Sequence, residues 1–174
     1  MTAPTVLVAF GSRNGGTAGI AEVIAATLRE EGINADAREA AGVRDVHGYA
    51  AVVLGGALYN RTWHRDAQRF GRRFGATLRE RPVWLFSSGP LDPAGAAGDA
   101  PPVPGVAALA SRIGARGHRT FGGRLDENAK GFIARAMVRN GRGGDFRDRA
   151  LISAWAREIA AALPQLAAGR TEAS

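Results

Sequence analysis

Short apolar segments alternate with longer amphipathic ones along this chain. The near-continuous apolar run from Thr5 to Gly11 is typical of a strand buried on both faces of a parallel sheet. Apolar residues then recur at helical spacing from about Thr17 to Glu31, and Gly32 is a typical residue to end such a helix. The chain therefore opens with a strand, a turn and a helix.

The same alternation continues to the end of the chain. Further strands are predicted at Ile33 to Arg38, Tyr49 to Gly56, Pro82 to Ser88 and His118 to Gly123. Helices are predicted at Trp63 to Leu78, at Val106 to Ile113 and around Ile152 to Leu163, the last capped near Asp145 or Asp148. Such alternation requires right-handed crossovers, so we predict an α/β fold: a doubly wound, five-stranded parallel sheet in the order 2-1-3-4-5, with helices on both faces.

The length of 174 residues suits a single domain. We predict one domain over residues 1–167 and a disordered tail over 168–174. The stretch from Pro90 to Gly105 is rich in proline, glycine and alanine and is predicted to be a long loop.

Three loops should meet at one edge of this sheet. In doubly wound sheets, ligands bind beyond the carboxyl ends of the strands, where the strand order reverses. The loops that converge there are Gly11 to Thr17, Gly56 to Trp63 and Ser87 to Leu91. We therefore expect the functional site at this edge.

The first of these loops has the composition of a phosphate-binding turn. Hydroxyl groups and unpaired backbone N–H groups solvate a phosphate, glycines let the backbone approach it, and the following helix directs its positive end toward it. The residues expected to hold the phosphate are Ser12, Arg13, Asn14, Gly15, Gly16 and Thr17.

These segments resemble the flavodoxin fold and its flavin mononucleotide (FMN) site. Ser12, Gly15 and Thr17 match the family's phosphate loop, while Asn14 stands where a hydroxyl residue is usual. The resemblance implies an aromatic wall for the flavin at Tyr59. It also implies that the third loop meets the flavin's pyrimidine edge through its backbone. The contacts expected from the second and third loops come from Ala57, Leu58, Tyr59, Asn60, Ser87, Ser88, Gly89 and Pro90.

Within this superfamily, the chain looks most like flavodoxin-domain proteins related to menaquinone-dependent protoporphyrinogen IX dehydrogenase. The resemblance rests on Val52 to Gly55, Arg81 to Ser87, Phe121 to Leu125 and Asp145 to Asp148. It implies a flavoprotein that cycles electrons or hydride at flavin N5, and we expect an oxidoreductase acting on a quinone or another small anionic compound. Protoporphyrinogen oxidation and an electron-transfer module for a partner enzyme are the alternatives.

Composition narrows the chemistry further. The chain has no cysteine, which removes disulfides and thiolate chemistry, and no apolar run long enough to span a membrane, so we expect a cytoplasmic protein. The net charge of +7 is opposite to that of typical flavodoxin shuttles and favours anionic substrates, with Arg13, Arg61 and Arg65 near the predicted cofactor loops. No aromatic-interleaved basic stripe indicates nucleic-acid binding.

Several alternatives stay open at this stage. Asp36 or Glu39 near the end of the second strand is compatible with the alternative of a nicotinamide-dinucleotide site. The basic amphipathic segment from Lys130 to Arg139 fits a helix over the sheet edge better than a membrane-surface helix. The three histidines are too dispersed to predict a metal site, and no catalytic acid or base is assigned. The electron donor, the acceptor and the oligomeric state, a dimer included, are not fixed by the sequence.

Overall fold

The computed structural model describes residues 5–12, 16–59, 62–89, 102–122 and 149–172, with side chains as far as residue 163 in the last segment. Its strands are β1 (Thr5–Gly11), β2 (Asn34–Glu39), β3 (Ala51–Tyr59), β4 (Thr62–Trp63), β5 (Val83–Gly89) and β6 (Gly117–Gly122). Its helices are α1 (Gly16–Glu30), the short 3-10 turn η1 (Ala40–Gly42), α2 (Arg65–Arg73), α3 (Gly75–Leu78), α4 (Pro104–Ile113) and α6 (Arg149–Glu172).

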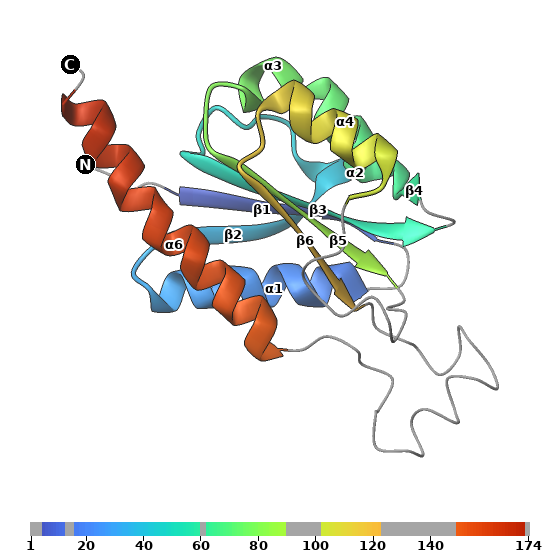
Figure 1. The fold of residues 1–174 in the computed structure, drawn as a ribbon, viewed down its shortest axis with the longest axis horizontal. Helices are drawn as coiled ribbons and strands as arrows, with labels where there is room; N and C mark the ends of the chain where they lie inside the picture. The colour runs from blue at the N-terminus through green and yellow to red at the C-terminus, as the bar shows by residue number, and fades with distance from the viewer. Residues whose placement is uncertain (1–4, 13–15, 60–61, 90–101, 123–148, 173–174) are drawn as a thin grey trace.

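Five of these strands form a parallel sheet in the order β2-β1-β3-β5-β6 (Figure 1). Counted along the chain without the two-residue β4, this is the predicted order 2-1-3-4-5. The strand order reverses between β1 and β3, which are paired from Val6↔Ala51 to Gly11↔Gly56. The predicted doubly wound α/β fold is therefore confirmed.

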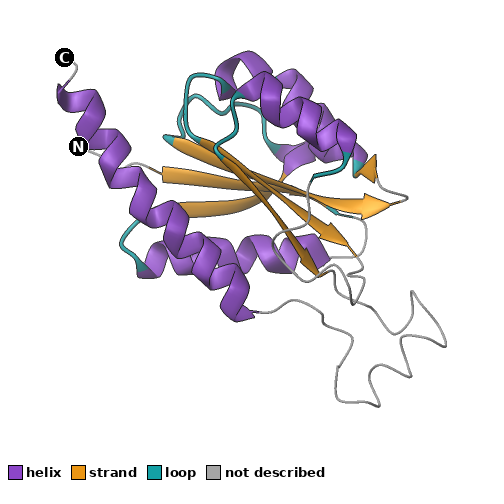
Figure 2. Cartoon of the chain, in the orientation of Figure 1, coloured by secondary structure: helices purple, strands orange, loops and turns teal. Residues whose placement is uncertain are grey.

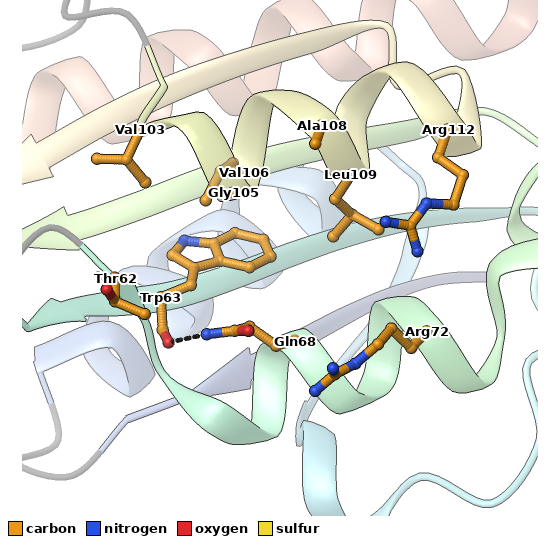
Figure 3. Close-up of a pocket in the computed structure, with 10 residues that line it drawn as sticks. All are labelled: Thr62, Trp63, Gln68, Arg72, Val103, Gly105, Val106, Ala108, Leu109 and Arg112. Carbon is orange, nitrogen blue, oxygen red and sulfur yellow. Dashed lines mark hydrogen bonds between the residues drawn. The ribbon is translucent and has the colours of Figure 1, made fainter.

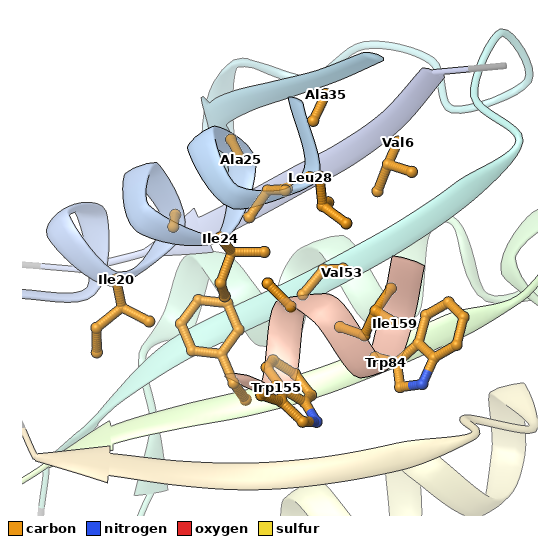
Figure 4. Packing of buried hydrophobic residues seen from close by; sticks show 14 of the residues in the cluster. Val6, Ile20, Ile24, Ala25, Leu28, Ala35, Val53, Trp84, Trp155 and Ile159 are labelled. Carbon is orange, nitrogen blue, oxygen red and sulfur yellow. The ribbon is translucent and has the colours of Figure 1, made fainter. Parts of the chain in front are cut away.

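Helices cover both faces of the sheet (Figure 2). Within β1, Val6 and Val8 belong to the core beneath α1 and α6, whereas Leu7 and Ala9 belong to the core beneath α2 and α4. This alternation explains the continuous apolar run, since both faces of the strand are buried. Figure 4 shows the first core, in which side chains of α1 meet Trp155 of α6 above the sheet.

Two glycines with positive φ end helices, one on each face of the sheet. Gly32, with a φ of 83°, follows α1, and Gly114, with a φ of 67°, follows α4. Side chains are strained in this left-handed conformation and glycine is not, so both positions suit a helix end. The prediction that Gly32 ends the first helix is confirmed.

The segment after β3 differs from the sequence prediction. We expected a helix from Trp63, but Trp63 pairs with Leu58 in the antiparallel strand β4, and α2 begins at Arg65. His64 sets this boundary, because its Nδ1 accepts a hydrogen bond from the backbone N–H of Asp66, 3.1 Å away, and so caps the helix. The helical spacing of apolar residues included Trp63 because Trp63 faces the same core as Ala67 and Phe70.

Other boundaries shift by a few residues. The predicted loop from Pro90 to Gly105 falls mostly outside the described residues, and its last two positions begin α4. The amphipathic segment from Lys130 to Arg139 lies wholly outside them. α6 extends to Glu172 and so overlaps the predicted tail at 168–174, which stays a prediction. None of the described helices is long and apolar enough to cross a membrane.

Candidate cofactor site

The ends of β1, β3 and β5 lie side by side at the carboxyl edge of the sheet. Gly11 pairs with Gly56, and Ala57, one residue further along β3, pairs with Ser88 of β5. The structure therefore brings together the strand ends from which the three predicted loops start, as expected where the strand order reverses. These strand ends also separate in a specific way, because β3 leaves β5 after Ala57 and pairs with β4 from Leu58 onward.

Thr17 carries the clearest sign of a ligand site at this edge. Its side chain is fully buried, with 0% of its surface exposed, and its Oγ1 has no hydrogen-bond partner among the described residues. A buried hydroxyl without a partner is destabilising, so native proteins rarely retain one without a reason. Thr17 is the second residue of the 15-residue helix α1, which has no acidic residue in its first turn. An anion there would satisfy both the hydroxyl and the positive end of the helix.

A tight hairpin rises from the same edge. Leu58 and Tyr59 of β3 pair in antiparallel fashion with Trp63 and Thr62 of β4. The Tyr59 ring is half-buried, and its centroid lies 6.2 Å from that of His64 at a tilt of 58°. The predicted aromatic wall is thus held by a hairpin whose second strand leads directly into the capped start of α2.

Two glycines allow the three segments to approach one another. A Cβ on Gly11 would lie 2.9 Å from the backbone nitrogen of Ala67 and 3.0 Å from His64 Nδ1. A Cβ on Gly89 would lie 3.2 Å from the Cβ of Leu58. Both separations are tighter than ordinary carbon contacts, so side chains at these positions would displace α2 or the hairpin. The glycines therefore fix the spacing of the loops.

Ser87 lies within β5, as the predicted strand from Pro82 to Ser88 implies, and its side chain contacts Trp63 of the core beneath α2 and α4. Its Oγ accepts a hydrogen bond from Trp63 Nε1 at 3.0 Å and lies 2.9 Å from His118 Nε2. These three side chains, of which Trp63 and Ser87 are buried and His118 is partly exposed, tie β4 to β5 and β6 beneath the hairpin. The hydroxyl of Ser87 is therefore engaged inside the protein.

His118 is held neutral in this chain. Burial, and secondarily the charge of the adjacent Arg119, lower the pKa of His118 to about 4. Its Nδ1 is buried and has no hydrogen-bond partner among the described residues. Protonation would place an unbalanced charge next to the Trp63 and Ser87 hydrogen bond.

We expect acid to destabilise the protein through His118. An unfolded-state histidine, with its ordinary pKa of about 6.5, binds a proton before the folded one does. The free energy of unfolding should therefore be unaffected above pH 6.5 and should fall between pH 6.5 and 4, by about 1 to 2 kcal/mol once partial solvent exposure is allowed for. Urea unfolding at pH 7 and pH 4.5 measures this, and H118Q should lose less stability over the same interval. An identical loss in H118Q would contradict the assignment.

The remaining predicted residues divide into two groups. Arg13, Asn14, Gly15, Asn60, Pro90 and Arg61 lie outside the described residues. Ser12, Gly16, Ala57, Ser88 and Gly89 lie at the described edge, and Arg65 is exposed at the start of α2. Asp36, considered for a dinucleotide, accepts a hydrogen bond of 3.4 Å from the Tyr49 hydroxyl. Within the described ranges, no histidine and carboxylate cluster could hold a metal ion.

The doubly wound parallel sheet, with its strand order reversing between β1 and β3, defines a flavodoxin-like fold. A family model described as a flavodoxin domain matches residues 7–143, so the chain belongs to the flavodoxin domain family. Membership of this family indicates FMN as the cofactor and electron transfer as the general role. Thr17 and the α1 terminus fit the phosphate of that cofactor. No curated protein matches the chain.

Solved structures agree on the fold. Rubredoxin oxygen:oxidoreductase from Desulfovibrio gigas matches with a TM-score of 0.64 and 16% identity over 94% of this chain, which spans 37% of that protein. A cysteine-to-serine mutant of the flavodoxin from Pseudomonas aeruginosa matches with a TM-score of 0.59 and 15% identity, covering 92% and 99% of the two chains. Flavodoxin 2 from Bacillus cereus matches with a TM-score of 0.56 and 19% identity, covering 68% and 84%.

Proposed function

We propose that this protein is an FMN-dependent oxidoreductase acting on a quinone or another small anionic compound. The observation that carries the proposal is the buried hydroxyl of Thr17 at the start of α1, which has no hydrogen-bond partner in the part of the chain that the structure describes. In this proposal Ser12, Gly16 and Thr17 bind the phosphate through hydroxyl and backbone N–H groups. The bound FMN supplies an isoalloxazine N5 that accepts electrons or hydride.

The surrounding residues would orient the flavin. Tyr59 would lie against the ring system, because an aromatic side chain offers an apolar wall for a flat cofactor. Ala57 and Leu58 continue the hairpin beside it, and the backbone of Ser88 and Gly89 would face the pyrimidine edge. Beneath them, the hydrogen bond from Trp63 to Ser87 fixes the hairpin on the sheet. The chain thus provides positioning, and no acid or base is assigned.

The charge of the adjoining helix supports the substrate class. α2 begins at this edge and carries Arg65, Arg69, Arg72 and Arg73, with Asp66 as its one acidic residue. An excess of positive charge raises the local concentration of anions and speeds their association. This sign is the opposite of that expected for an electron shuttle that docks on a basic partner.

A steady-state screen tests this proposal. The FMN-loaded protein is supplied with NADH or NADPH and with a quinone pair, 1,2-naphthoquinone-4-sulfonate and neutral 1,2-naphthoquinone. We expect turnover without a partner protein, and a kcat/KM for the sulfonate that falls several-fold between about 10 mM and about 500 mM ionic strength, because salt screens exposed charges. The value for the neutral quinone should change little.

Two outcomes would contradict the proposal. If no donor and acceptor pair turns over, protoporphyrinogen IX included as a donor, the chain is better described as an electron-transfer module for a partner enzyme. If both quinones respond equally to salt, positive charge does not select the substrate. Comparing each quinone with itself across salt concentrations removes the effect of their different reduction potentials.

A further inference from the structure

A hollow separate from the phosphate turn opens between α2 and α4. Its volume is about 280 Å³, near the lower end of small-molecule sites. We define the α2–α4 groove by the residues that line it: Thr62, Trp63, Gln68, Arg72, Val103, Gly105, Val106, Ala108, Leu109 and Arg112. Figure 3 shows the Trp63 indole at its centre, between the two helices.

The floor of the α2–α4 groove is apolar and firmly held. Trp63, Val106 and Leu109 are 4%, 1% and 6% exposed, so most of each side chain belongs to the core. The indole is fixed by its hydrogen bond to Ser87 Oγ, and the backbone oxygen of Trp63 accepts a hydrogen bond of 2.7 Å from Gln68 Nε2. Such a preformed apolar surface favours a flat or aliphatic group.

Two guanidinium groups line the same groove, one from each helix. Arg72 of α2 and Arg112 of α4 are exposed, and neither forms an ion pair in the part of the chain that the structure describes. The described lining contains no carboxylate to neutralise them. Guanidinium groups bind carboxylates and phosphates through paired N–H donors. Like charges held beside one groove are also less costly when an anion lies between them.

From this arrangement we infer that the α2–α4 groove binds a small amphipathic anion, with its apolar body on Trp63 and Leu109 and its carboxylate or phosphate on Arg72 and Arg112. Both charges line the same groove as the apolar floor, so the site selects for a charged end and an uncharged body together. None of the groove's residues belongs to the phosphate turn, and only Thr62 and Trp63 belong to a predicted cofactor loop, so the two guanidinium groups that carry the inference do not depend on FMN.

Isothermal titration of the FMN-loaded protein tests the inference with three probes of one shape. They are 2-naphthoate, 2-naphthyl phosphate and neutral 2-naphthamide. We expect one equivalent of at least one anion to bind, with the amide at least tenfold weaker. The stronger of the two anions identifies whether the groove prefers a carboxylate or a phosphate.

Variants locate the binding. R72Q and R112Q should each weaken anion binding about tenfold, whereas R116Q, which removes an exposed charge just beyond α4 and outside the groove, should leave it unchanged. G105L should block the groove without harming the fold. A Cβ on Gly105 meets nothing within 4 Å, and leucine is a better helix former than glycine.

The inference fails if neither anion binds, if the amide binds as tightly as the anions, or if G105L with an unreduced melting temperature binds like the unaltered protein. Loss of anion binding in R116Q equal to that in R72Q would show a general charge effect and would also overturn it. Absorbance of bound FMN, recorded on each variant, keeps this result separate from the proposed flavin function.

Discussion

Replacing Gly55 by alanine is expected to destabilise the protein by about 3 kcal/mol or more, a fall in melting temperature of about 10 °C. Gly55 lies in β3 opposite Phe86 of β5, and a Cβ there would overlap the Phe86 ring. The ring cannot move aside easily, because Phe121 and Trp155 lie 6.4 Å and 6.2 Å from it between centroids. Thermal and urea unfolding measure the effect.

Matched variants distinguish this overlap from a general cost of removing a glycine. G42A is the control, because a Cβ on Gly42 meets nothing within 4 Å, and its stability should be unchanged. Replacing the Phe86 ring by the smaller leucine side chain, with F86L in the G55A background, should restore part of the lost stability, since the two residues couple through direct contact. If G55A is as stable as G42A, the packing of Phe86 on β3 is not as described.

Replacing Thr17 by valine is expected to weaken FMN binding by tenfold to a hundredfold, because a hydrogen bond to a charged group contributes about 1.5 to 3 kcal/mol. The same change should leave the cofactor-free protein equally stable or more stable, since it replaces by a methyl group a buried hydroxyl that has no partner among the residues described. Most substitutions of buried residues lower both the stability of the protein and its affinity for the ligand. Weaker FMN binding without a loss of stability is therefore specific to a hydroxyl whose partner is the ligand. FMN titration and urea unfolding measure the two quantities.

Thr27 provides the control on the same helix. It is also buried, but its Oγ1 donates to the Val23 carbonyl at 2.8 Å and lies 3.2 Å from Ser153 Oγ. T27V should therefore lose about 1 kcal/mol of stability and keep its FMN affinity. If T17V destabilises the cofactor-free protein as much as T27V does and binds FMN normally, the hydroxyl of Thr17 has a structural partner and no role at the phosphate.

The sequence predicted the sheet because its strands are buried on both faces. The run around Leu7 and Val8 is apolar at every position. A strand has this pattern when helices cover both faces of its sheet. The end of the first helix was also predictable from a local feature, because Gly32 adopts the positive φ that glycine tolerates best. Strand order followed from connection rules that hold for parallel sheets in general.

The contacts of the site could not be predicted in the same way. The hydrogen-bonded side chains of Trp63, Ser87 and His118 come from positions 24 and 31 residues apart along the sequence. No local sequence pattern encodes such contacts. Trp63 also fits a helical apolar stripe, so tertiary pairing with Leu58 had to decide between strand and helix. The α2–α4 groove likewise depends on how the two helices pack against each other. His64 is not one of the usual N-cap residues, so no local pattern marked its capping of α2.

The most direct measurement compares FMN with riboflavin, which lacks the phosphate. If the turn after β1 and the Thr17 hydroxyl bind a phosphate, the cofactor-free protein should bind FMN at least a hundredfold more tightly than riboflavin, as expected when several donors to one charged group are lost together. Flavin fluorescence titration of the unaltered protein gives both dissociation constants under one condition. Equal affinities, or no binding of FMN at all, would contradict the account.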